Sequence, residues 1–70
     1  MAVSLKAART NAELTRPVVI KRLYDEYGIK LSVNSLANYE NKRKKSQPDI
    51  ITAKALASIY GMSVDDIIFL

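Results

Sequence analysis

The residues best suited to specific recognition are two amides and a small apolar side chain in the segment 32–41. The carboxamides of Asn34 and Asn38 can each bond N6 and N7 of adenine, and Val33 can contact a thymine methyl group. Leu36 and the aromatic residue three positions later share one helical face, and the amides turn away from it. Such a helix suits the major groove of DNA. An ordinary amphipathic surface helix explains the segment equally well.

Positive charge is concentrated directly after this segment. The chain contains 11 Lys and Arg against 7 Asp and Glu, which gives a formal net charge of +4. Four of these cations form the continuous run 42–45. A localised cationic run favours a polyanionic partner such as a nucleic acid, and a solvated surface loop is the plain alternative.

Composition argues against several kinds of chemistry. The 70 residues include no cysteine and no histidine, so disulfides, thiolate zinc sites and the commonest general base are missing. We therefore expect a non-enzymatic protein with no cofactor, no metal and no small-molecule substrate. The apolar runs are too short to cross a bilayer and no hydrophobic signal segment opens the chain, which predicts a cytoplasmic protein without membrane contact. The length suits one small domain over residues 1–70.

Apolar spacing and capping signals predict an all-α fold with five helices and no sheet. The predicted helices cover residues 4–12, 15–28, 32–41, 48–61 and 63–68. Thr15 is expected to cap the second helix, which Gly28 ends. The buried faces are expected to include Ile50, the two isoleucines at 67 and 68, and all four tyrosines, with their hydroxyls at the edge of the core.

The order and spacing of these residues resemble the Cro/CI-type helix-turn-helix family, which includes the repressors of lambdoid phages and many small bacterial regulators. The matching positions are Leu14, Thr15, Leu23, Ser32, Leu36, Tyr39, Glu40, Pro48, Leu56, Ala57, Gly61, Ser63 and Asp66. The match covers nearly the whole chain. It implies a lambda-repressor-like domain of five helices, in which the third helix enters the major groove.

The resemblance also implies roles for individual residues. It assigns the reading of bases by the third helix to Val33, Asn34, Ser35 and Asn38. It assigns contacts with the DNA backbone to Arg16, Asn41, Lys42, Arg43, Lys44 and Lys45. A partly buried ion pair between the first helix and the end of the third is implied for Arg9 and Glu40.

The chain departs from the family pattern around the turn of the motif. Residues 24–31 separate Leu23 from Ser32, where the family usually has a shorter segment, so the second helix is extended. The usual glycine after the third helix is replaced by Lys42. The added segment is expected to bring Asp25 and Glu26 close to the motif, where their negative charges would repel phosphate. These departures affect the docking angle rather than the fold.

Two functions remain open at this point. The long second helix resembles the small lytic-side regulators of temperate phages of Gram-positive bacteria, which act in the host cytoplasm. The first hypothesis is a transcription regulator of a lysis/lysogeny switch that binds double-stranded operator DNA. The alternative is an antirepressor that binds the DNA-reading domain of a CI-type repressor. The apolar residues 67–70 are also compatible with a weak homodimer. The alternative is that the isoleucines 67 and 68 pack into the core and the last two residues form a frayed tail.

Overall fold

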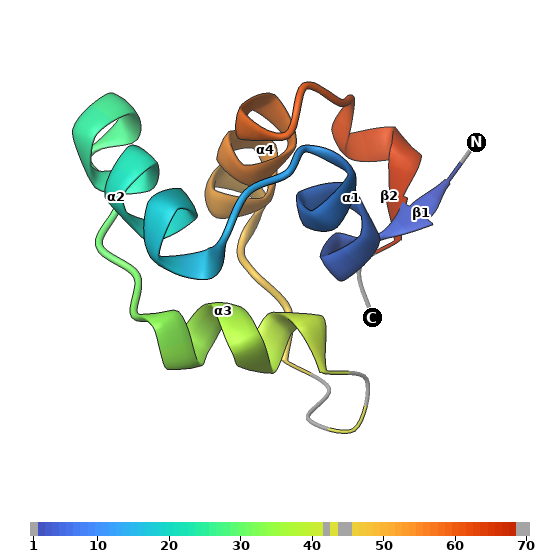
Figure 1. The fold of residues 1–70 in the computed structure, drawn as a ribbon, viewed down its shortest axis with the longest axis horizontal. Helices are drawn as coiled ribbons and strands as arrows, with labels where there is room; N and C mark the ends of the chain where they lie inside the picture. Colours follow the sequence, from blue (N-terminus) through green and yellow to red (C-terminus); the bar gives the residue numbers. More distant parts are fainter. Residues whose placement is uncertain (1, 42, 44–45, 69–70) are drawn as a thin grey trace.

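The computed structural model describes residues 2–41, 43 and 46–68, and four α-helices account for most of them. Figure 1 shows α4 between α2 on the left and α1 on the right, with α3 lying across the bottom of the view. The helices are α1 (Leu5–Asn11), α2 (Arg16–Tyr27), α3 (Val33–Glu40) and α4 (Ile50–Ile59). The chain therefore has the predicted helix-turn-helix arrangement, in which α2 is followed by the candidate reading helix α3.

Local sequence determines where these helices begin and end. The side chains of Ser4, Ser32 and Asp49 each accept a hydrogen bond from the backbone amide three residues further on. Thr15 occupies the N-cap position of α2, as predicted, although its side chain makes no capping hydrogen bond. Gly28 ends α2 in the left-handed conformation with φ of 67°, which glycine adopts without a steric penalty.

The core joins the helices through a few large side chains. The fully buried ones are Val19 and Leu23 of α2, Leu36 of α3 and Leu56 of α4. Each of them is an aliphatic residue on the inward face of its helix, as the apolar spacing predicts. Because α2 packs against both α3 and α4, the orientation of α3 is set by the core and not by the connecting turns alone.

The end of the chain differs from the predicted fifth helix. A single 3₁₀ turn, η1 (Val64–Asp66), leads into the two-residue strand β2 (Ile67–Ile68), which pairs in parallel with β1 (Val3–Ser4). Adjacent β-branched residues favour extended backbone, and pairing with β1 buries Ile67. Successive side chains of a strand point to opposite faces, so Ile68 is exposed instead of facing inward. The prediction of five helices without a sheet is therefore wrong in this segment.

The extended α2 also changes the position of several side chains. Tyr24 and Tyr27 are exposed, and so is Ile50 at the start of α4, whereas the predicted pattern buried all three. Leu23 is the last buried residue of α2, and the last turn of the helix, residues 24–27, is exposed. Figure 1 shows this turn at the upper left, well separated from α3. Asp25 and Glu26 are exposed within this turn, and their effect on a bound phosphate stays a prediction.

Candidate nucleic-acid interface

The outward face of α3 carries small, uncharged side chains. Val33, Asn34 and Asn38 are exposed, while Leu36 anchors the opposite face of the helix in the core. Ser35 is half-buried, and its hydroxyl accepts a hydrogen bond from the Ser32 hydroxyl at 2.9 Å. Three of the four residues predicted to read bases are thus open to a ligand, and the fourth supports the helix cap.

A buried carboxylate at the end of α3 connects three parts of the chain. The Glu40 side chain is only 1% exposed. The Arg9 guanidinium donates to it from Nε at 2.7 Å and from Nη2 at 3.2 Å. Arg9 also donates from Nη1 to the carbonyl of Leu14 at 2.9 Å. The hydrogen bond with Glu40 raises the pKa of Arg9 above its usual value. Glu40 therefore ties α1 and the α1–α2 loop to the candidate reading helix.

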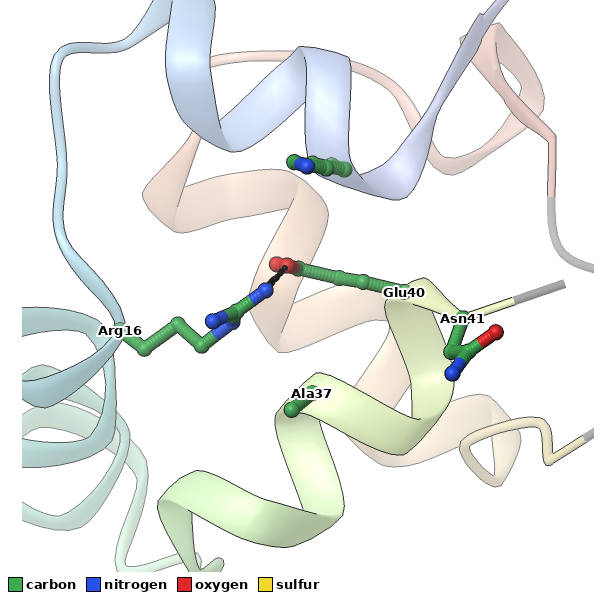
Figure 2. Close-up of a pocket in the computed structure, with 5 residues that line it drawn as sticks. Arg16, Ala37, Glu40 and Asn41 are labelled. Carbon is green, nitrogen blue, oxygen red and sulfur yellow. Dashed lines mark hydrogen bonds and ion pairs between the residues drawn. The ribbon is translucent and has the colours of Figure 1, made fainter. Parts of the chain in front are cut away.

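A second arginine shares the same carboxylate. Figure 2 shows the Arg16 guanidinium meeting Glu40, with Nε and Nη2 at 3.0 and 2.9 Å from Oε1. The Arg16 side chain remains 35% exposed, and its Nη1 has no hydrogen-bond partner within the described part of the chain. Two guanidinium groups and one carboxylate leave a net charge of +1, so this group remains cationic although Glu40 is negative.

An open cleft lies beside this charge cluster. Its volume is about 430 Å³, and Lys6, Arg16, Ala37, Glu40 and Asn41 line it (Figure 2). The Asn41 side-chain oxygen accepts the backbone amide of residue 43 at 3.0 Å, which leaves the amide nitrogen to donate. Lysine, arginine and asparagine donors from three helix ends therefore surround one opening. This arrangement can bind an oxyanion such as a phosphate group.

Sequence reasoning missed two features of this cleft. It did not consider Lys6, although Lys6 and Arg9 are three residues apart on α1 and so lie on one side of that helix. It also assigned Arg16 to phosphate alone, whereas the structure shows Arg16 bound to Glu40 as well. Among the other predicted backbone contacts, Arg43 is exposed. The positions of Lys42, Lys44 and Lys45 lie outside the described residues.

Among the described residues, no group of three or more acidic, histidine or cysteine side chains is placed to hold a metal ion. No helix in that part of the chain is long and apolar enough to span a membrane.

Comparison with known proteins identifies the family of this chain. The sequence pattern of the helix-turn-helix family matches residues 5–67. The chain therefore belongs to this family, in its Cro/CI-type branch, and the predicted resemblance is confirmed. No curated protein and no solved structure gave a match. The family consists of DNA-binding transcription regulators, and the chain is one by this membership.

Proposed function

We propose that this chain regulates a phage lysis/lysogeny switch by binding operator DNA, with α3 in the major groove and the cleft on the DNA backbone. The observation that carries this proposal is the position of the cleft. Ala37 lines the cleft, and its neighbour Asn38 is exposed on the outward face of α3. A duplex that contacts this face therefore brings its phosphates close to the cationic opening. The long α2 is the feature that supports a phage regulator in particular.

The proposed contacts divide into two kinds. Asn34 and Asn38 read adenines and Val33 contacts a thymine methyl group, each good bidentate pair contributing about 1–3 kcal/mol of discrimination. Arg16 and Lys6 bind phosphate, with further backbone contacts from Asn41 and the basic loop. Phosphate contacts supply affinity that falls with salt, and base contacts supply sequence preference.

The experiment is a binding titration of the purified chain with the DNA that flanks its own gene, at several salt concentrations. Lys6→Ala should weaken binding to every sequence and reduce the slope of log affinity against log salt by about 0.9. Lys54→Ala removes an exposed cation from α4 and is the matched control, which should leave the slope unchanged. Asn38→Ala should instead relax the preference at individual base pairs. A wild-type chain without any footprint would refute operator binding.

The antirepressor function is the second candidate, because the exposed face of α3 bears no charge over residues 33–38. An uncharged face with an exposed valine also suits a protein partner. The deciding experiment is a titration of the CI-type repressor bound to its operator with this chain, at two salt concentrations. Displacement of the repressor without direct operator binding, at both salts, would support the antirepressor and exclude operator reading. A footprint by this chain alone, altered by Asn38→Ala, would do the opposite.

A further inference from the structure

The hydroxyl group of Tyr60 is a buried polar group that no part of the proposed function uses. Tyr60 follows the last turn of α4 as its C-cap residue and is only 6% exposed. Its hydroxyl oxygen has no hydrogen-bond partner among the described residues. A buried hydroxyl that makes no hydrogen bond lowers the stability of the fold, whereas phenylalanine would fill the same space without this cost. The stability of the free chain therefore does not explain why a tyrosine occupies this position.

The charges that act on this hydroxyl are those of the cluster around Glu40. Burial raises the pKa of the Tyr60 hydroxyl, and the negative charge of Glu40 raises this pKa further. The positive charges of Arg9 and Arg16 act on the same pKa in the opposite direction. Because the interaction between charges weakens with distance, the hydroxyl lies near all three groups. It is therefore a donor placed close to a buried carboxylate to which it does not donate in the free chain.

Of the two arginines bound to Glu40, Arg16 is the one that can leave. The Arg9 side chain is 12% exposed, donates to both carboxylate oxygens and is held in addition by the carbonyl of Leu14. Arg16 bonds to Oε1 alone, an oxygen that it shares with Arg9, and its side chain is 35% exposed at the wall of the cleft (Figure 2). A phosphate group offers the forked guanidinium two oxygens instead of one shared oxygen. An anion in the cleft can therefore compete with Glu40 for Arg16.

We propose that Arg16 exchanges partners when the cleft takes up a phosphate group of DNA. Its guanidinium moves from Oε1 of Glu40 to the phosphate, and the Tyr60 hydroxyl donates to Oε1 in its place. This exchange rests on the proposed function, because the phosphate belongs to the bound duplex. Tyr60 is then a positioning residue, which acts on DNA through Glu40 and Arg16. It satisfies the buried carboxylate in the bound state, so α3 stays tied to α1 while Arg16 is released to bind the backbone of the duplex.

The first test is thermal denaturation without DNA of the wild type, Tyr60→Phe, Arg16→Met and the double variant. Arg16→Met removes the competing donor from Oε1, so the Tyr60 hydroxyl should pair with Glu40 already in the free chain. We therefore expect Tyr60→Phe to leave the Tm unchanged or higher in the wild-type background, and to lower it by roughly 4–8 °C in the Arg16→Met background. Tyr24→Phe is the matched control: Tyr24 is 55% exposed, and its effect should be the same in both backgrounds. An equal effect of Tyr60→Phe in both backgrounds would overturn the proposal.

The second test is a binding titration of the same variants with the DNA that flanks the gene of this chain. In the wild-type background Tyr60→Phe should weaken binding about three- to tenfold, because only the bound state uses the hydroxyl. In the Arg16→Met background it should change the affinity by less than about twofold, because the hydroxyl bonds to Glu40 with and without DNA. Unchanged affinity in the wild-type background, or equal weakening in both, would refute the exchange and leave operator binding intact. A wild-type chain that does not bind this DNA would instead refute the proposed function, and with it the phosphate for which Arg16 leaves Glu40.

Discussion

Replacing Glu40 by glutamine tests whether one carboxylate holds the DNA-binding face together. The substitution keeps the shape of the side chain and removes its charge. In the structure this nearly fully buried carboxylate accepts hydrogen bonds from both Arg9 and Arg16. The Arg9 side chain is itself only 12% exposed, so its charge would lose its main partner in a place that is largely shielded from water.

The expected effect follows from burial. Removing one partner of a buried ion pair lowers stability by about 3–5 kcal/mol, and the glutamine oxygen retains part of the hydrogen bonding, so we expect about 3 kcal/mol for Glu40→Gln. Such a loss would lower the Tm of a domain of this size by roughly 12–24 °C. Arg16 is over a third exposed, and Glu40 keeps Arg9 without it, so Arg16→Met should lower the stability by less than about 1 kcal/mol.

Urea denaturation followed by far-ultraviolet circular dichroism measures these differences. Glu13→Gln is the matched control, because Glu13 is an exposed carboxylate in the α1–α2 loop without an ion pair to another described residue. The midpoint urea concentration for unfolding of the control should equal that of the wild type. A Glu40→Gln variant as stable as the control, or an Arg16→Met variant as unstable as Glu40→Gln, would refute the reasoning.

Three further substitutions test other contacts. Tyr60→Phe should leave the free energy of unfolding unchanged or raise it by up to about 1 kcal/mol, because the buried hydroxyl has no hydrogen-bond partner among the described residues; a clear loss in urea denaturation would contradict this. Leu36→Ala should lower that free energy by about 2–5 kcal/mol, since the side chain is fully buried, and an unchanged Tm would show that it does not anchor α3. Hydrogen bonds from the side chain and backbone of Thr52 lower the pKa of Asp49 from its usual 3.8. The stability they add is present above that value and is lost as the pH falls through the lowered pKa. Asp49→Ala should therefore lower the Tm at pH 7, and the two melting curves should converge in strongly acidic solution.

Several features of this protein could be predicted from the sequence because they depend on neighbouring residues. Ser32 caps α3, Leu36 faces the core, and Asn34 and Asn38 turn outward. Each of these results follows from helical periodicity or from a hydrogen bond within one turn. The family assignment rests on the same local spacing, which is why the chain could be assigned to the helix-turn-helix family before its structure was described.

Other features were decided by the packing of distant segments. Periodicity does not show that Arg16 reaches Glu40, 24 residues further along the chain, or that Lys6 lines the same cleft. The final isoleucines form a strand instead of a helix because β1 lies beside them. These outcomes depend on how the helices are oriented about Leu23, Leu36 and Leu56, and only the assembled core sets those orientations.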